Sequence, residues 1–374
     1  MMNQLLILSA SAGAGHTRAA QALEKAAREK KCAAEIRHED ALQYTLWWYR
    51  QIYSRGYLIC IHHFPHLFGW LYRLTDPPWK YEMGRFLLDR IHAGALIRLI
   101  EQVQPDWVLS THFLPPELVS QLKRKKRFRG RQAVIVTDMD VHGYWLCRNF
   151  DHYFVALEES RKYLEGLGIA PDQITVSGIP VDPVFAIPKD KQTLREKFGL
   201  EPNLPSILVS TGAHAVGPVE AMVHSLLSLK LPSQLIVICG HNQKLRNRLQ
   251  NISAGLAQKS PVKLKAVGYT HEMDEYMTAA DILVGKPGGL TAAEAMAKGL
   301  VFVMVNPVPG QEERNADHLL EAGAALRCHH LSSLGYKVGE LLENPQRMAA
   351  MQVNAKKMAR PDAAQEIIQK VLTI

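Results

Sequence analysis

Residues 281–315 read DILVGKPGGLTAAEAMAKGLVFVMVNPVPGQEERN, and this stretch determines the predicted fold. Its first apolar run, residues 282–284, predicts a buried strand that is ended by Lys286, Pro287 and two glycines. Good helix formers follow from Thr291 onward, so a helix is expected there. Adjacent glycines let the backbone approach a ligand, and the free N–H groups at a helix start favour a phosphate. The order of strand, glycine turn and helix therefore predicts a phosphate-binding unit.

Polar side chains are expected at the mouth of this unit. Glu294 lies three residues after Thr291, where its carboxylate can accept hydrogen bonds from a ribose diol. A second apolar run, residues 301–305, predicts a strand whose end brings Gln311 and Glu312 to the same rim, and this amide–carboxylate pair suits sugar hydroxyls. The alternative is that the glycines form a tight connection and that Glu294 is a solvated helix residue. The second polar segment favours the ligand site.

The segments KPGGLTAAEA (286–295) and PVPGQEERNA (307–316) resemble the nucleotide-sugar site of GT-B glycosyltransferases. Within that fold the chain is similar to the monogalactosyldiacylglycerol synthases and processive diacylglycerol glucosyltransferases, and to the related N-acetylglucosaminyltransferase that forms lipid II. The resemblance implies an α/β protein with two Rossmann-like, doubly wound domains facing across a cleft, a UDP-sugar as donor, and neither a metal nor another cofactor. It also implies donor contacts from Gly288, Gly289, Leu290, Thr291, Glu294, Gln311 and Glu312.

Length and composition agree with two globular domains, since the 374 residues are 47% hydrophobic and 21% charged. Apolar strand patterns alternate with helical patterns in both halves, which predicts parallel βαβ units. The expected divisions are an N-terminal domain (1–182), a Pro-rich linker (183–204) and a C-terminal domain (205–374) whose last helix could return to the first domain. The expected strands cover residues 4–9, 34–38, 107–110, 133–137, 153–155, 174–177, 207–210, 235–239 and 262–267.

Cysteine usage and hydropathy bear on the compartment. The five cysteines have no paired spacing, which argues against a disulfide framework and a zinc site. A strand is expected within four residues of the N-terminus, and no apolar run approaches the roughly 20 residues of a membrane span. The expected location is therefore the cytoplasm, with peripheral association at the inner face of the cell membrane.

His16 ends the glycine loop SAGAGH after the first expected strand, in the crevice where open α/β sheets bind ligands. A histidine there can be a helix cap, but the resemblance implies a base that removes a proton from an acceptor hydroxyl, beside Gly15. After a later strand, TDMDVHGYW (137–145) supplies Asp138 and His142 as further catalytic candidates; the alternative is that the aspartates cap a turn. His112 is a weaker candidate.

Other donor contacts are implied by the resemblance alone. The loop 210–217 retains only Gly212 and Gly217 where the family has more glycines, which leaves its contacts and the donor preference open. Gly240 and Asn242 match the family's segment after the next strand, and the segment 267–270, with Tyr269, matches the place that receives the uracil edge.

Two features predict contact with a membrane. Residues 41–99 are rich in aromatic side chains, including Trp47 and Trp48, which suit a membrane interface. Seven cations lie within residues 123–131, and the chain has a net charge of +8. This basic run, which includes Lys123, Arg124, Lys125, Lys126 and Arg127, either contacts anionic headgroups or is a solvated face. No nucleic-acid recognition module accompanies it.

The sequence therefore predicts an inverting glycosyltransferase that moves a hexose from a UDP-sugar to a lipid hydroxyl, with diacylglycerol as the expected acceptor. A UDP-sugar epimerase or hydrolase on the same fold is the first alternative. A non-catalytic nucleotide-sugar sensor is the second, suggested by the thinned glycine loop at Gly212. The hexose, the processivity and the oligomeric state stay open.

Overall fold

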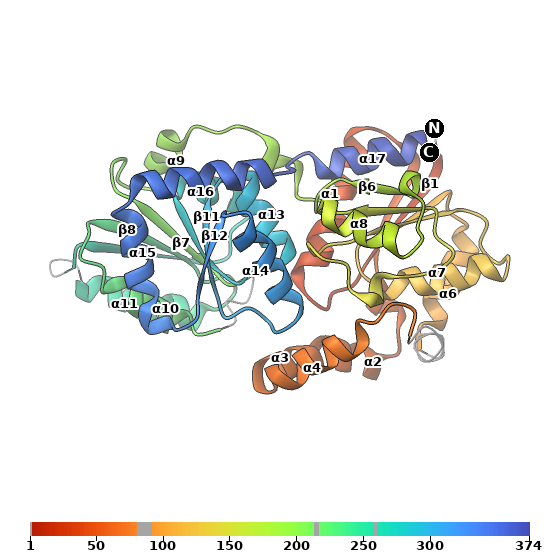
Figure 1. Ribbon diagram of the computed structural model, residues 1–374, viewed down its shortest axis with the longest axis horizontal. Helices are drawn as coiled ribbons and strands as arrows, with labels where there is room; N and C mark the ends of the chain where they lie inside the picture. The colour runs from red at the N-terminus through yellow and green to blue at the C-terminus, as the bar shows by residue number, and fades with distance from the viewer. Residues whose placement is uncertain (1, 81–91, 213–216, 257–259) are drawn as a thin grey trace.

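Two six-stranded, fully parallel sheets form the framework of the molecule (Figure 1). The computed structural model describes residues 2–80, 92–212, 217–256 and 260–374. The first sheet has the order β2-β1-β3-β4-β5-β6, and the second has the order β12-β11-β10-β7-β8-β9. The predicted α/β fold with two doubly wound domains is confirmed. The strands are β1 Met2–Ser9, β2 Ala33–Asp40, β3 Trp107–Ser110, β4 Arg131–Ile135, β5 His152–Val155, β6 Ile174–Val176, β7 Ser206–Ser210, β8 Ser233–Ile238, β9 Val262–Val267, β10 Ile282–Gly285, β11 Val301–Val305 and β12 Ala325–Cys328.

Helices cover both faces of the first sheet, which explains the continuous apolar runs of its strands. In β1, Leu5 and Ile7 pack with α1 and α17, whereas Leu6 and Leu8 on the opposite face pack with α6 and α7. The second sheet is covered in the same way. The helices at the first sheet are α1 Ala14–Glu29, α6 Gly94–Val103, α7 Leu114–Arg124, α8 Glu158–Gly166 and α17 Ala363–Thr373. Those at the second are α9 Lys191–Lys197, α10 Val219–Leu227, α11 Gln243–Leu256, α12 Met273–Ala279, α13 Gly289–Ala297, α14 Gln311–Glu321, α15 Leu334–Leu342 and α16 Pro345–Met358.

The chain passes between the two sheets twice, after β6 and between α16 and α17. The two crossings touch, because a Cβ on Gly178 (φ +86°) would lie 2.4 Å from the Cβ of Arg360. Helix α17 packs on α1 of the first domain. The chain thus returns to the domain in which it began.

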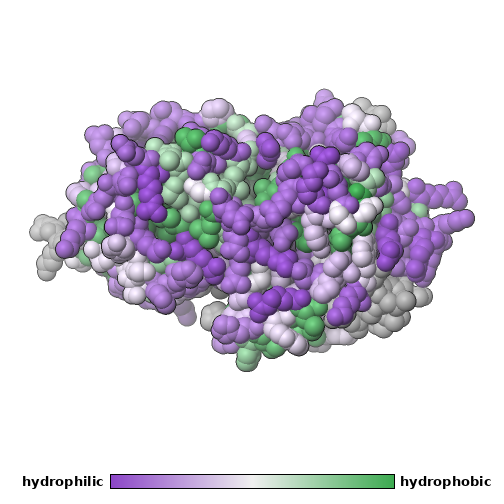
Figure 2. Space-filling view, in the orientation of Figure 1, coloured by the Kyte–Doolittle hydropathy of each residue, from purple (hydrophilic) through white to green (hydrophobic). Residues whose placement is uncertain are grey.

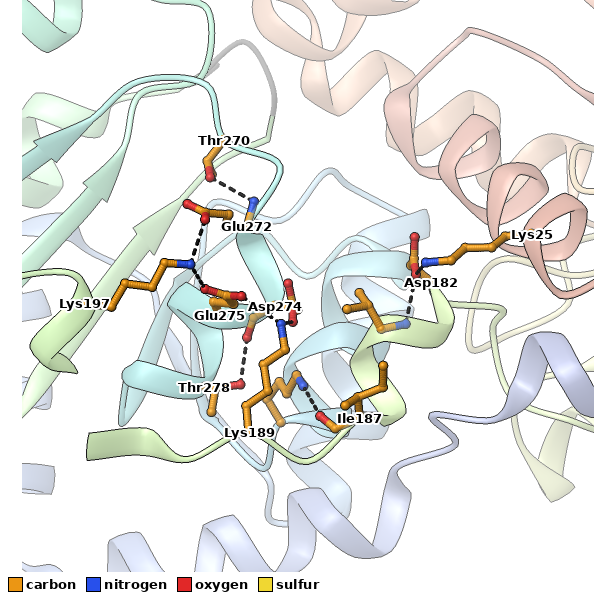
Figure 3. A network of polar contacts seen from close by, with 12 residues as sticks. Lys25, Asp182, Ile187, Lys189, Lys197, Thr270, Glu272, Asp274, Glu275 and Thr278 are labelled. Atoms are coloured by element: carbon orange, nitrogen blue, oxygen red, sulfur yellow. Dashed lines mark hydrogen bonds and ion pairs between the residues drawn. The ribbon is translucent and has the colours of Figure 1, made fainter. Parts of the chain in front are cut away.

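Ion pairs hold the connection after β6 against the second domain (Figure 3). Lys189 contacts Asp274 and Glu275 of α12 at 2.6 and 2.9 Å, and Lys197 of α9 contacts Glu272 at 2.8 Å. At the start of the connection, Lys25 of α1 contacts Asp182 at 2.8 Å. Residues 189–197 are therefore tied to the second domain, whereas Asp182 is tied to the first.

The aromatic-rich stretch forms short helices that lie below the two sheets in Figure 1. These are α2 Trp47–Gln51, a π-helical turn Ile52–Gly56, α3 Tyr57–His63 and α4 Pro65–Thr75. In α4, Pro65 occupies the first turn, where its missing N–H costs no hydrogen bond. Within the described part of the chain, no helix has the length and apolar character that crossing a membrane requires.

Two details differ from the sequence prediction. Strand β12 was not expected, because Arg327 interrupts its short apolar run. Helix α13 begins at Gly289, two residues before the expected start at Thr291, since Gly288 is extended (ψ 144°) and serves as its N-cap.

Candidate active site

The order of the strands in each sheet indicates where the candidate site lies. In the first sheet the order reverses between β1 and β3, and in the second it reverses between β7 and β10. Ligands of open α/β sheets bind beyond the carboxyl ends of strands at such points. The loops there carry His16 after β1, Thr111 after β3 and Gly288 after β10. The start of α1 contacts the start of α13, because a Cβ on Gly15 would lie 3.8 Å from the Cβ of Leu290. The two crevices therefore face each other.

His16 lies in the first turn of α1, and its ring is only partly exposed. Its Nδ1 is 2.9 Å from the carbonyl oxygen of Thr111 and 2.8 Å from Oγ1 of Thr137. A carbonyl oxygen only accepts, so Nδ1 carries the proton and Nε2 has the free lone pair. Burial lowers the pKa of His16, although the carboxylate of Asp138 and the Thr111 carbonyl oppose this effect. A neutral imidazole with a free Nε2 can act as a general base.

Asp138 connects the two domains. Both of its carboxylate oxygens accept hydrogen bonds from Nε2 of Gln311 at 3.0 Å, and Oδ1 also accepts one from Asn315 at 3.3 Å. Asn315 is fully buried, and its Oδ1 accepts a hydrogen bond from the backbone N–H of Met139 at 2.8 Å. Burial raises the pKa of Asp138, and the nearby His16 opposes that rise. In this closed arrangement Gln311, expected to bind a sugar, is paired with a carboxylate of the opposite domain.

Glu294 lies in α13 and is buried, with 2% of its surface exposed. Its Oε1 is 2.7 Å from the guanidinium of Arg18, which comes from α1 of the opposite domain. Burial raises the pKa of Glu294 to about 7, and the positive charge of Arg18 limits the rise. The carboxylate is at the expected place in the fold, but Arg18 covers it here. The predicted ribose contact therefore requires Arg18 to move away from Glu294.

Gly289 explains why a glycine pair stands at the start of α13. A Cβ there would lie 2.1 Å from the carbonyl oxygen of Thr137, which is closer than any side chain tolerates. The close approach of the two domains therefore requires a glycine at this position. Leu290 is buried, and Thr291 is partly exposed in the first turn. The first N–H groups of α13 lie at this contact, so the predicted phosphate cradle is at the domain interface.

Glu312 has its own backbone partner. Its Oε2 accepts a hydrogen bond from the N–H of Val308 at 2.6 Å, and burial raises its pKa. A Cβ on Gly288 would lie 3.7 Å from Oε1 of Glu312. Glu312 therefore lines the same turn as the glycine pair.

The remaining donor candidates lie at the ends of neighbouring strands of the second sheet. Gly212 follows β7 with φ +88°, and Gly240 follows β8 with φ +53°. Asn242 caps the start of α11, because its Oδ1 accepts a hydrogen bond from the N–H of Leu245 at 3.0 Å. Tyr269, half exposed, stacks on His241 with ring centroids 4.2 Å apart. This exposed pair of rings lies where the uracil was expected.

His142 uses both ring nitrogens within the protein. Its Nδ1 accepts a hydrogen bond from the N–H of Tyr144 at 3.1 Å, so Nε2 carries the proton and donates to the carbonyl of Tyr72 at 2.8 Å. Burial lowers the pKa of His142. The ring therefore links the loop after β4 to α4.

The structure separates the two predicted membrane features. Trp47 and Trp48 lie in α2, beyond the carboxyl end of β2, whereas the basic run precedes β4 and so lies at the amino-terminal edge of the same sheet. Within the run, Lys123 pairs with Asp151 and Arg127 pairs with Glu101, while residues 124–127 are exposed.

Several residues of this interface were missed by the sequence analysis: Arg18, Thr111, Thr137 and Asn315. Thr111 and Thr137 follow buried strands, and Arg18 and Asn315 lie within or beside the quoted motifs. A polar residue at the end of a parallel strand was the available signal.

Two doubly wound domains with facing crevices define the GT-B class of fold. Two family models match the chain: "Monogalactosyldiacylglycerol (MGDG) synthase" over residues 16–181 and "Glycosyltransferase family 28 C-terminal domain" over residues 206–367. A processive diacylglycerol beta-glucosyltransferase of Bacillus cereus (strain AH187) is 30% identical over 381 residues, covering 99% of this chain and 93% of the relative.

The chain belongs to this family of glycosyltransferases, which confirms the resemblance and the prediction of an enzyme. Among solved structures it is similar to MurG of Acinetobacter baumannii (TM-score 0.64, 16% identity, 100% of both chains). It is also similar to UDP-GlcNAc 2-epimerase from Neisseria meningitidis bound to UDP-GlcNAc (TM-score 0.60, 15% identity, 99% and 100% coverage). At such identities these two structures support the fold alone.

Proposed function

We propose that the protein transfers a hexose from a UDP-sugar to the free hydroxyl of diacylglycerol, with inversion at the anomeric carbon. The observation that carries this proposal is the tautomer of His16, whose Nδ1 donates to the Thr111 carbonyl and whose Nε2 is available as a base. Its helix α1 meets the start of α13, the proposed phosphate cradle. The named substrate of the Bacillus cereus relative supports the choice of acceptor.

The reaction is a single displacement. Nε2 of His16 accepts the proton of the acceptor hydroxyl while its oxygen forms a bond to the anomeric carbon. The bond between that carbon and the UDP oxygen breaks on the opposite side, which inverts the configuration. The N–H groups and the positive end of α13 stabilise the charge that develops on the leaving UDP. No step in this mechanism uses a metal.

The donor contacts follow from the second domain. The Glu294 carboxylate accepts hydrogen bonds from the ribose hydroxyls of the donor. Gln311 and Glu312 bind its sugar, and the segment at Tyr269 binds its uracil ring. In the structure, Arg18 holds Glu294 and Asp138 holds Gln311. The domains must therefore separate to admit the donor and then close again over it, as many transferases do.

The acceptor comes from a membrane surface, and helices α2–α4 are the proposed contact. They expose the large apolar side chains of Trp47, Ile52, Ile59, Phe64, Leu67 and Trp70. Figure 2 shows a small green, hydrophobic area at the lower edge of the molecule among pale and purple residues. An exposed apolar cluster of this kind is typical of a membrane or protein contact. The proposed location is the inner face of the cell membrane.

The test is a product assay. Purified protein is incubated with a panel of UDP-hexoses, UDP-glucose first, and with vesicles containing diacylglycerol, and the products are identified by mass. The proposal expects a hexosyl-diacylglycerol and free UDP. A free hexose or an epimerised donor would support the hydrolase or epimerase alternative. UDP-sugar binding without any product would support the sensor.

A further inference from the structure

Arg314 of α14 joins three parts of the molecule. Its Nη1 lies 3.0 Å from Oδ2 of Asp140, and its Nη2 lies 2.5 Å from Oδ2 of Asp76, the residue that follows α4. The guanidinium also lies 5.4 Å from the centre of the Tyr72 ring. One side chain of the second domain thus contacts the loop after β4 and the end of α4.

The end of α4 is also held by the first domain. His142 donates a hydrogen bond to the carbonyl of Tyr72, and the N–H of Gly143 donates to Oδ1 of Asp76 at 3.3 Å. A Cβ on Gly143 would lie 2.3 Å from the carbonyl oxygen of Asp76, so the backbones approach as closely as glycine allows.

The second domain also makes close contacts with α4. A Cβ on Gly310 (φ +87°) would lie 2.5 Å from Cδ1 of Tyr72, and a Cβ on Gly69 would lie 2.7 Å from the Cβ of Pro309. The segment Pro309–Gly310 immediately precedes α14, which carries Gln311 and Arg314. The helix α4 therefore lies between the domains and contacts both.

This arrangement links movement of α4 to separation of the two domains. Separation of the domains must break the contact of Arg314 with Asp140, which belongs to the first domain. It must also either break the contact of Arg314 with Asp76 or pull α4 away from Gly143. A surface that fixes α3 and α4 therefore acts on the distance between the domains. Conversely, a ligand that closes the cleft fixes α4.

We propose that Arg314 is a positioning residue that couples the apolar helices α3 and α4 to closure of the cleft, so that a lipid surface and a donor nucleotide strengthen each other's binding. This inference rests on the proposed function for its two ligands. Coupling between binding sites is reciprocal, so vesicles raise UDP affinity by the same factor as UDP raises vesicle affinity.

The chemistry of arginine suits this role. A planar guanidinium can serve two carboxylates and a ring face at once, whereas a lysine ammonium is a single point of charge. The Arg314→Lys variant should therefore keep only part of the coupling, and Arg314→Gln should lose it.

The experiment measures the UDP dissociation constant with and without vesicles of phosphatidylglycerol and diacylglycerol. For the wild-type protein we expect vesicles to tighten UDP binding by at least about fivefold, within the usual range of such couplings. For Arg314→Gln we expect a change below about twofold, and for Arg314→Lys an intermediate value. UDP affinity without vesicles serves as the measure of an intact donor site.

A matched control is Arg248→Gln, which removes an exposed arginine–carboxylate pair with Glu220 inside the second domain. It should keep the wild-type coupling. Asp76→Asn, which leaves α14 intact, should lose coupling as Arg314→Gln does, and the double variant should lose no more than either single one. A wild-type protein without coupling, or an Arg314→Gln variant with full coupling, would overturn the inference.

A second measurement separates this inference from the proposed function. Hydrogen exchange at the backbone of α14 is followed on adding vesicles alone, without nucleotide. The inference expects slower exchange in the wild type and in Arg248→Gln but not in Arg314→Gln. If UDP does not bind at all, the proposed function fails, but the exchange measurement with vesicles alone still tests the coupling. Unchanged exchange in the wild type overturns the coupling itself.

Discussion

At the scale of single residues, a backbone carbonyl group determines which ring nitrogen of His16 carries the proton. The Thr111 carbonyl fixes the proton on Nδ1, and no substitution of the Thr111 side chain can remove that carbonyl. The hydrogen bonds of Asp138 go to Gln311 and Asn315, whereas Nδ1 of His16 contacts Thr111 and Thr137. Asp138 acts on His16 through its charge. The orienting group is thus a carbonyl in place of the carboxylate that many catalytic histidines use.

The first prediction concerns the base. His16→Ala should lower the transfer rate by about 10²- to 10⁴-fold, because it removes the group that accepts the hydroxyl proton. UDP affinity should change little, since His16 belongs to the wall opposite the donor. Rates at saturating donor and diacylglycerol check the first point, and UDP titration checks the second. Wild-type turnover in this variant would place the base elsewhere.

The second prediction concerns Glu294, whose pKa burial raises from 4.5 to about 7. The folded protein then holds this proton more tightly than the unfolded chain, so the stability conferred by the protonated form is fully present below pH 4.5 and is lost as the pH rises through 7. Glu294→Gln, which mimics the protonated acid, should therefore gain stability relative to wild type between pH 5 and pH 8, by at most about 3 kcal/mol.

Urea unfolding of both proteins at the two pH values measures this difference, and the other titrating groups cancel in the comparison. A constant difference in unfolding free energy across the pH range would show that Arg18 keeps the carboxylate ionised throughout. The same variant should bind UDP about 10- to 100-fold more weakly, because a neutral amide replaces the proposed ribose acceptor.

At the scale of elements, the strands were predictable where apolar residues run continuously, as in residues 282–284 and 301–305. The positions of the loops that form the candidate site were predictable because the carboxyl ends of parallel strands lie at the same edge of a sheet. What could not be predicted depends on how the domains meet. The contact between Arg18 and Glu294 joins residues far apart in the chain, and it exists only because α1 and α13 face each other. The sequence likewise gave no sign that the basic run and α2 lie at opposite edges of one sheet.

The third prediction separates those two membrane features. Replacing Phe64 and Trp70 by Glu should release the protein from both neutral and anionic vesicles, because it puts charges in place of two exposed apolar side chains, one at the N-cap of α4 and one within it. Replacing Arg124, Lys126 and Arg129 by Glu should weaken only the anionic contact. These three exposed cations form no ion pair with a residue that the structure describes, unlike Lys123 and Arg127.

Sedimentation with the two kinds of vesicle measures the effects. Each cation near an anionic surface contributes about 1 kcal/mol, so the loss of three cations alone should weaken anionic binding by about 100-fold. The three added carboxylates should weaken it further, and high salt should abolish the difference. Unchanged binding of the triple variant would make the basic run a solvated face, and unchanged binding of the α4 variant would remove these helices from the proposed contact.

At the scale of the whole molecule, the two crossings of the chain act together. Gly178 and Arg360 are in contact, and α17 belongs to the core of the first domain although the chain reaches it through the second. Motion between the domains must therefore bend both crossings at one place. The interface between the domains consists of close backbone contacts and buried polar pairs, chiefly at Gly289, Asn315 and Glu294.

The last prediction tests whether this close interface is needed for transfer. Gly289→Ala adds a Cβ that would lie 2.1 Å from the Thr137 carbonyl oxygen, so the domains should no longer close fully. The N–H groups of α13 remain, and alanine is a better helix former than glycine, so the second domain should fold and bind UDP nearly as before. Transfer should fall by about 10²-fold, since a displacement of about 1 Å between reacting groups has such an effect. The matched control is Gly255→Ala in α11 of the second domain, where an added Cβ would meet no atom within 4 Å. It should leave the transfer rate and the radius of gyration in solution close to wild type, whereas Gly289→Ala should increase the radius in the presence of UDP. A Gly289→Ala protein as compact and as active as Gly255→Ala would mean that transfer occurs in a more open arrangement than the one described.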